Sequence, residues 1–119
     1  MITIEQLKEV KERTESLNRY LDIDGKKMQY EEEQLRTQDP GFWEDAKRAE
    51  AQMKLVKGLE KWIKGYAAVE TLASELETAY EFFREELVSE AEVDELYARA
   101  LTALEDLELK NMLRREEDS

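Results

Sequence analysis

Carboxylates are the most abundant residues in this sequence that could do chemistry. Thirty of the 119 residues are Asp or Glu, and some stand together, as in Glu31-Glu32-Glu33. Glycoside hydrolysis or metal binding would need such groups to converge in a concave pocket, where their pKa values would shift. Carboxylates spread over helix surfaces point at water instead, and this is the interpretation that we favour here.

Two residue types with catalytic side chains are missing from the sequence. It has no His and no Cys, which excludes imidazole bases, thiolate nucleophiles and Cys/His zinc sites. It also has no glycine-rich phosphate loop and no metal-loop spacing. We therefore predict an interaction domain that is no enzyme and has no catalytic, cofactor-binding or metal-binding residue.

Five residues are candidate partner contacts. Four lysines recur at steps of three, four and three, at Lys54, Lys57, Lys61 and Lys64. On a helix they would form either a basic ridge for an acidic partner or RNA, or a solvated face whose aliphatic stems cover apolar surface. Phe82 lies on the same outer face of the predicted helix. It would either contact a partner or show that the apolar stripe of that helix has rotated by a fraction of a turn.

The charge is strongly negative and unevenly distributed. The net charge of −12 disfavours non-specific binding to nucleic acid. Residues 70–95 hold ten acids and a single base, a local net charge of −9, whereas residues 44–64 hold four acids and six bases, a local net charge of +2. The acidic block could repel RNA and steer the domain towards a basic protein surface, or it could be a solvated hairpin tip.

Helix is favoured almost everywhere, because only one Pro and four Gly interrupt a chain rich in Glu, Lys, Leu, Ala and Arg. A capping box at Thr3 begins a first helix of about 20 residues, with an apolar stripe through Leu21. Asp22, Asp24 and Gly25 then offer a cap and a kink. Met28 and Leu35 continue the stripe on a second helix, which ends near residue 38 before Asp39-Pro40-Gly41.

A third helix is expected over about residues 44–87, because apolar residues follow a heptad pattern there for more than four heptads. The predicted seam consists of Leu55, Leu59, Trp62, Tyr66, Val69, Ala73, Leu76, Tyr80, Phe83 and Leu87. One flank of the seam is mostly small, at Ala51, Gly58, Gly65, Leu72 and Ala79. Small residues let a second helix approach closely, so we expect this helix to contact two neighbours.

A capping box at Ser89 and Glu92 begins a fourth helix. The predicted fold is therefore all-α, an antiparallel bundle of four helices. Two shorter N-terminal helices would pack along the long third helix, together with the C-terminal helix. No apolar run approaches the ~20 residues that span a bilayer, and no signal-peptide pattern is present, so we expect a cytoplasmic protein.

Two short motifs extend the interpretation beyond a helical bundle. Residues 19–27 read RYLDIDGKK, and residues 39–45 read DPGFWED. In this order and spacing they resemble the N-terminal domain of bacterial peptide chain release factor 2, and the resemblance extends over essentially the whole chain. Gly41 and the segment Glu44-Asp45-Ala46 depart from the family pattern, so that pattern does not define the first residue of the third helix.

The second motif has a structural interpretation in its own right. Asp39 and Pro40 would stop the second helix, since Pro and the residue before it cannot continue it. Phe42 and Trp43 would act as an apolar plug between the second and third helices.

The resemblance implies a role in translation termination. In this family a Ser-Pro-Phe tripeptide reads UAA and UGA stop codons and a Gly-Gly-Gln motif triggers peptidyl-tRNA hydrolysis, and neither occurs here. The chain would comprise the helical domain at residues 1–113 and the start of a connector at 114–119. The implied partners are the stalk-base and GTPase-associated region of the ribosome and the GTPase release factor.

One alternative stays open at this point. The heptad seam alone is equally typical of a structural coiled-coil or oligomerisation module unrelated to translation. A dimer through the seam would favour that alternative, whereas the bundle predicts a monomer whose seam is covered internally. Neither hypothesis involves a membrane, a cofactor or sequence-specific nucleic-acid binding by this chain.

Overall fold

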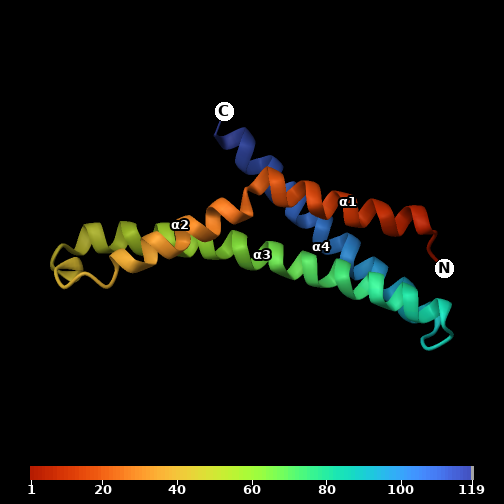
Figure 1. Cartoon of the computed structure of the whole chain (residues 1–119). Helices are drawn as coiled ribbons and strands as arrows, with labels where there is room; N and C mark the ends of the chain where they lie inside the picture. Colours follow the sequence, from red (N-terminus) through yellow and green to blue (C-terminus); the bar gives the residue numbers. More distant parts are fainter. Residues whose placement is uncertain (119) are drawn as a thin grey trace. The chain divides into compact units, whose positions relative to one another are not determined.

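The computed structural model describes residues 1–118, and Ser119 lies outside the described residues. Within the described part the chain forms α1 (Ile4–Leu21), α2 (Ile23–Arg36), the short 3-10 helix η1 (Phe42–Glu44), α3 (Ala46–Arg84) and α4 (Glu90–Glu117) (Figure 1). The prediction of an all-α protein with four main helices that pack against one another is confirmed. None of these helices is both long and apolar enough to cross a membrane.

The chain divides into two compact units, and α3 contributes to both. The three-helix unit comprises residues 1–20 and 66–118, and the hairpin unit comprises residues 21–65. The first unit therefore contains α1, the second half of α3 and α4. The second contains α2, η1 and the first half of α3.

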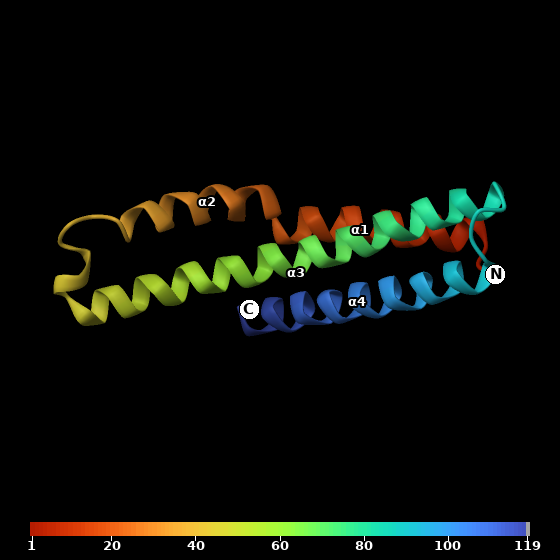
Figure 2. The same ribbon diagram turned by 90° about the horizontal axis from the view of Figure 1, so that it is seen from below.

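In the three-helix unit, α3 runs antiparallel to both of its neighbours. Tyr66, at the start of this half of α3, donates a hydrogen bond from its hydroxyl to the carbonyl of Thr14 at 3.2 Å. Further along α3, Glu77 pairs with Lys11, which lies earlier in α1. Figure 2 shows α4 alongside α3 and running the opposite way. The buried core of this unit includes Val10, Leu17, Val69, Leu76, Val93, Ala100 and Leu104.

Local capping signals were predicted correctly at three helix starts. The backbone N–H of Gln6 donates to the Thr3 hydroxyl at 3.2 Å, and the Gln6 side chain accepts from the Thr3 N–H at 2.8 Å. The backbone N–H of Glu92 donates to the Ser89 hydroxyl at 3.2 Å at the start of α4. Asp22 caps α2, as described below. Each cap depends on residues within three positions, so the sequence alone predicts it.

The apolar stripe predicted along α2 is wrong. Met28 and Leu35 are 65% and 63% exposed. The buried residues of α2 are instead Ile23 near its start and Glu33 near its end. Gln52 of α3 donates from Nε2 to the Glu33 carboxylate at 2.6 Å and to its carbonyl at 2.9 Å. Because this interface is partly polar, apolar spacing does not reveal which side of α2 is buried.

The seam predicted along α3 is correct in the middle and wrong at its ends. Its members Leu59, Tyr66, Val69, Ala73 and Leu76 are buried, whereas Leu55 is 41% exposed and Leu87 lies exposed beyond the last turn. Val56, which was expected on a flank, is buried in place of Leu55. A straight α-helix drifts by about 20° per heptad relative to a 3.5-residue repeat, so the contact side moves to other residues over several turns.

The helix boundaries differ slightly from the expected ones. α3 spans Ala46–Arg84 rather than about 44–87. It ends in a turn in which Glu86 adopts a left-handed conformation with φ 62°. The N–H of Glu86 donates to the carbonyl of Phe83, and the N–H of Leu87 donates to the carbonyl of Phe82. This Schellman pattern provides hydrogen bonds for two carbonyls in the last turn of the helix. α4 extends to Glu117, so the expected connector is helical up to that residue, and the domain boundary at 113 stays a prediction.

Candidate partner-docking surfaces

The four lysines at 54, 57, 61 and 64 are brought together on the outer side of α3 in the hairpin unit. All four are exposed, and their spacing aligns them along the helix axis. α2 packs against the opposite side, where Val56 and Leu59 are buried. We call this set of four residues the lysine ridge. Its exposure agrees with both the functional and the solvated-face interpretation, so its role stays a prediction.

Only one lysine of the ridge has a charged partner within the described part of the chain. Lys64 forms an ion pair with Glu60, one turn earlier on α3. The hydrogen bond to Glu60 raises the pKa of the Lys64 ammonium above its usual value of 10.5. Lys54, Lys57 and Lys61 make no hydrogen bond or ion pair with any described residue. Three ammonium groups therefore point into solvent and are available for an external anion.

Gly58 lies in the middle of the ridge and has no packing role within the described residues. A Cβ built on it would have no atom within 4 Å apart from those of its chain neighbours and of the adjacent α3 backbone. The expectation that the small flank of α3 packs against a helix is therefore wrong at this position. The flank is used further along, since Ala79 is buried and Leu72 lines a hollow with residues of α4, among them Ala98 and Ala103.

The expected apolar plug is wrong for Trp43, whereas Phe42 is half-buried, and the structural role of the Asp-Pro-Gly-Phe-Trp turn stays a prediction. The Trp43 side chain is 65% exposed, and the ring of Phe42 contacts it edge-on, with centroids 4.7 Å apart at 88°. Phe42 lines a hollow together with Arg36 of α2 and Gln52 of α3. Asp39 accepts a hydrogen bond from the N–H of Phe42 through its carbonyl at 3.0 Å, and Pro40 follows it in the turn.

Asp45 supplies the N-terminal cap of α3. Its carboxylate accepts from the backbone N–H of Arg48 at 3.2 Å, three residues further on. Asp45 belongs to the segment that departs from the pattern of the resembled family, and it fulfils the capping role with its own side chain. The spacing from Asp45 to Arg48 is the signal that places the helix start.

Phe82 is 42% exposed and lies on the last turn of α3, in the three-helix unit. Its carbonyl accepts the hydrogen bond from Leu87 that closes the turn at 2.9 Å. Phe82 and the lysine ridge belong to different units, so they are considered separately.

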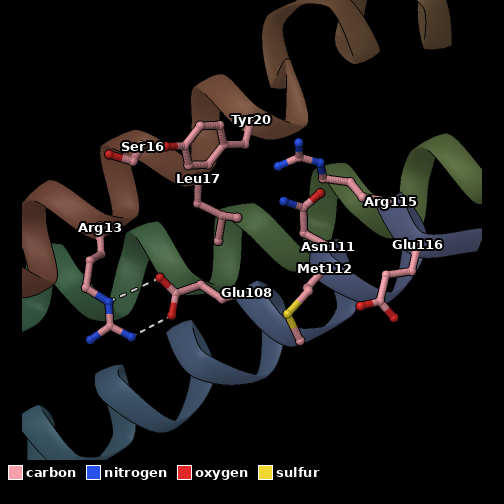
Figure 3. Close-up of a pocket in the computed structure, with 9 residues that line it drawn as sticks. All are labelled: Arg13, Ser16, Leu17, Tyr20, Glu108, Asn111, Met112, Arg115 and Glu116. Carbon is pink, nitrogen blue, oxygen red and sulfur yellow. Dashed lines mark hydrogen bonds and ion pairs between the residues drawn. The ribbon is translucent and has the colours of Figure 1, made fainter. Parts of the chain in front are cut away.

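A groove of about 630 Å³ between α1 and α4 was missed by the sequence interpretation (Figure 3). Leu17 and Asn111 form its buried part, and Tyr20 and Met112 are exposed at its edge. At one end Arg13 binds Glu108 through two hydrogen bonds, Nε to Oε2 at 3.1 Å and Nη2 to Oε1 at 2.5 Å. The two residues are 95 positions apart, so no local pattern signals their contact.

The described residues contain no group of three or more carboxylates that could hold a metal ion. The acidic residues of the block at 70–95 are mostly exposed along α3, the following turn and α4.

The model of the PCRF domain family matches residues 26–119. The chain belongs to this family. The match begins within the RYLDIDGKK motif and includes the whole Asp-Pro-Gly-Phe-Trp turn. The PCRF domain therefore comprises most of α2, the turn and both long helices α3 and α4.

Several relatives of the chain are bacterial proteins named peptide chain release factor 2. The protein from Tolumonas auensis is 36% identical over 124 aligned residues, which cover 98% of this PCRF-domain chain and 32% of the relative. The protein from Aeromonas salmonicida is 35% identical, covering 97% of the chain and 32% of the relative. The protein from Pseudoalteromonas translucida is 33% identical over 104 residues. The expected resemblance is confirmed, and the chain spans about a third of the length of these relatives.

Proposed function

We propose that this PCRF domain is the docking module of a release factor that acts in translation termination at UAA and UGA codons. It contacts the stalk-base and GTPase-associated region of the ribosome and the GTPase release factor. The observation that carries this proposal is the alignment of 98% of the chain with a third of a release factor 2 sequence. The proposed location is the cytoplasm, where ribosomes work.

Codon reading and peptidyl-tRNA hydrolysis are assigned to other parts of such a protein. Neither Ser-Pro-Phe nor Gly-Gly-Gln occurs in this sequence. His and Cys are also missing, so this domain has no imidazole general base and no thiolate nucleophile. In this division of labour the domain needs no cofactor or metal ion, because it positions the factor and does no chemistry.

The lysine ridge and Phe82 are the proposed contact residues. Three unpaired ammonium groups of the ridge form a local positive surface on an acidic molecule. Positive groups on an otherwise negative protein steer the encounter and fix the orientation of an acidic partner. Phe82 offers an exposed aromatic ring in the other unit, and aromatic rings are enriched at binding hot spots.

The proposal is tested by co-sedimentation of this chain with bacterial ribosomes that carry a stop codon in the A site. We expect the chain to pellet with the ribosomes. Reversing the four lysines of the ridge to Glu should reduce the bound fraction, most strongly at low salt, because salt screens the attraction. The matched control reverses four other exposed cations, Lys8, Lys27, Arg99 and Lys110.

The outcomes separate the parts of the proposal. Failure of the unmodified chain to pellet, at any salt concentration that keeps the ribosomes intact, rejects the docking role. Equal binding of the ridge variant and the control variant rejects the ridge and leaves the docking role in place. A loss of binding with Phe82→Ala alone would assign the contact to Phe82.

We propose further that the chain is a monomer. Tyr66, Val69 and Leu76 of the heptad seam are already buried by α1 and α4 within the three-helix unit. A seam that is covered internally leaves little apolar surface for a coiled-coil partner. Sedimentation equilibrium should give the mass of one chain, and a stable dimer would favour the oligomerisation module instead.

A further inference from the structure

The groove between α1 and α4 has a buried amide donor that no described residue uses. Asn111 lines the groove and is only 6% exposed. Its Oδ1 accepts a hydrogen bond from Nη2 of Arg114 at 2.8 Å, which fixes the orientation of the amide. Its Nδ2 donates to no described residue. Buried amide groups are almost always hydrogen-bonded, so an acceptor for Nδ2 must come from outside these residues.

Two exposed residues at the edge of the groove are also free to bind. Arg115 follows Asn111 by four positions on α4, so the two side chains are neighbours. Arg115 and Tyr20 make no hydrogen bond, ion pair or ring contact with any described residue. Figure 3 shows the amide nitrogen of Asn111 pointing towards Leu17 and Tyr20 of α1. The groove therefore combines a guanidinium, an amide and a phenol, all of which can donate hydrogen bonds.

The groove also offers apolar surface next to these donors. Leu17 is buried in its floor, whereas Met112 and Tyr20 are exposed at its edge. A methionine side chain is flexible and adapts to partners of different shape, and tyrosine is enriched at binding hot spots. The groove volume of about 630 Å³ lies in the range of ligand sites. A molecule that fits it therefore needs an apolar part as well as hydrogen-bond acceptors.

The other polar residues of the groove are already engaged. Arg13 and Glu108 bind each other through two hydrogen bonds at one end. The Ser16 hydroxyl accepts from Nη2 of Arg19 at 3.1 Å, and Glu116 has a contact of its own. The free hydrogen-bonding capacity of the groove is therefore concentrated in the amide, the guanidinium and the phenol.

We propose that this groove binds an extended peptide segment of a partner protein, in which an acidic residue follows a large aliphatic residue. The aliphatic side chain would pack on Leu17 and Met112. The carboxylate would pair with Arg115, and a main-chain carbonyl of the segment would accept from Nδ2 of Asn111. The groove belongs to the three-helix unit and the lysine ridge to the hairpin unit, so this site is separate from the ridge.

A single carboxylate matches the groove better than a polyanion does. Arg115 is the one cation lining the groove that has no partner among the described residues. Residues 70–95 of the same unit carry a net charge of −9. The several phosphates of RNA or of a nucleotide would be repelled by this charge and would leave Leu17 and Met112 without an apolar contact. One carboxylate beside an aliphatic side chain satisfies both halves of the groove.

NMR titration of the isotope-labelled chain can test this inference, because the side-chain amide signals of Asn111 report on the proposed contact directly. The probe is the capped peptide acetyl-Ala-Leu-Asp-Ala-amide, whose only charge is the Asp carboxylate. One control peptide has Asn in place of Asp, and another has Ala in place of Leu. Inorganic phosphate tests whether any anion is sufficient.

We expect the acidic peptide to shift the Asn111 amide signals in a saturable way, and both control peptides to bind more weakly. Arg115→Gln should weaken binding of the acidic peptide by about tenfold, because it removes a charge-assisted pair. Arg99→Gln is the matched control, since Arg99 is also exposed on α4 and has no partner among the described residues. Its affinity should be unchanged.

A second variant tests the amide donor itself. Asn111→Asp keeps an oxygen that accepts from Arg114 and replaces Nδ2 by a second oxygen, which cannot donate. Binding of the acidic peptide should be lost, as followed by the methyl signals of Leu17 and Met112. Circular dichroism checks that this variant stays folded, and Arg115→Gln tests the site independently of it.

Several results would overturn the inference: no shift with the acidic peptide, equal binding of the acidic peptide and either control peptide, the same shifts with phosphate, or unchanged affinity in Arg115→Gln. Asn111 signals that move with protein concentration before peptide is added would identify a second copy of the chain as the occupant, which also contradicts the proposal. The ribosome sedimentation experiment tests the docking role separately. Sedimentation without peptide binding removes the peptide groove alone, and peptide binding without sedimentation removes the release-factor role alone.

Discussion

The Asp22 carboxylate occupies the space that a side chain at Gly25 would need. Asp22, in a left-handed conformation with φ 49°, accepts a hydrogen bond from the Gly25 N–H at 3.2 Å and so caps α2. A Cβ on Gly25 would lie 2.1 Å from its Oδ2. Lys26 adds a hydrogen bond to the carbonyl of Leu21. The RYLDIDGKK motif thus encodes the N-terminal cap of α2.

This relationship predicts that alanine has different effects at two glycines. Gly58→Ala should raise the free energy of unfolding by about 1 kcal/mol, because the site is an exposed helix position with open space. Gly25→Ala should be less stable than Gly58→Ala by about 1–2 kcal/mol, because Asp22 must give up its cap. Urea unfolding followed by circular dichroism measures both.

The Asp22→Gly background supplies the control for this prediction. Glycine tolerates the left-handed conformation and has no carboxylate to displace. In that background Gly25→Ala should therefore no longer lower the free energy of unfolding. The difference between the two backgrounds measures the coupling between positions 22 and 25. Additive effects of the two substitutions would contradict the steric explanation.

The burial of Ile23 and the exposure of Leu35 on α2 predict different stability costs for alanine at these two positions. Ile23 is fully buried, so Ile23→Ala should cost about 2–4 kcal/mol of stability. Leu35→Ala should change stability by less than about 0.5 kcal/mol, since the side chain is exposed. Equal costs at the two positions would mean that the apolar stripe through Leu35 is buried after all.

The Arg13–Glu108 pair should contribute measurably to the stability of the three-helix unit. Both side chains are about two-thirds buried, and two hydrogen bonds join them. Glu108→Gln should cost about 1 kcal/mol, as expected for a partly desolvated two-bond pair. Asp106→Asn removes the exposed pair with Lys110 and is the control, with an expected cost of a few tenths of a kcal/mol. A double-mutant cycle with Arg13→Gln isolates the coupling, and the prediction fails if that coupling is zero.

The contacts of the Met1 amino group predict that the free energy of unfolding depends on pH in mildly alkaline solution. It lies 3.1 Å from the Glu90 carboxylate and 3.2 Å from that of Asp94. Hydrogen bonds to Glu90 and then Asp94 raise its pKa above 8.0 in the folded state. The stabilising contribution is complete below pH 8 and is lost as the pH rises through the folded pKa.

Acetylation of the Met1 amine provides the comparison. The free energy of unfolding of the unmodified chain should decrease above pH 8 relative to the acetylated chain. Glu90→Gln should reduce this difference and lower the amine pKa measured by NMR titration. Parallel stability curves for the two forms would show that the contact does not form in solution.

Much of the fold can be predicted from sequence because its signals are local. Capping boxes at Thr3 and Ser89, the Asp22 cap and the stop at Pro40 each depend on a few neighbouring residues. Helix type and number follow from composition and from the rarity of Gly and Pro. The family resemblance also depended on two short motifs, and the PCRF match confirms it.

The candidate surfaces were predicted only in part. The spacing of the lysines was enough to place them on one outer side of α3, because helical periodicity sets that arrangement. It could not show that Gly58 has open space, or that Trp43 lies outside the helix pair. The groove beside Arg13 and Glu108 gave no sequence signal, since α1 and α4 meet there through residues far apart in the chain.

The amino-acid sequence by itself determined the helices, their caps, the breaks between them and the lack of His and Cys. These features depend on backbone propensity and on bonds within one turn. The tertiary structure decided which side of each helix is buried. A polar pair, Glu33 and Gln52, occupies the α2–α3 interface, and the drift of a straight helix moves the contact from Leu55 to Val56. Burial is a property of two packed surfaces, so the pattern of one helix cannot determine it.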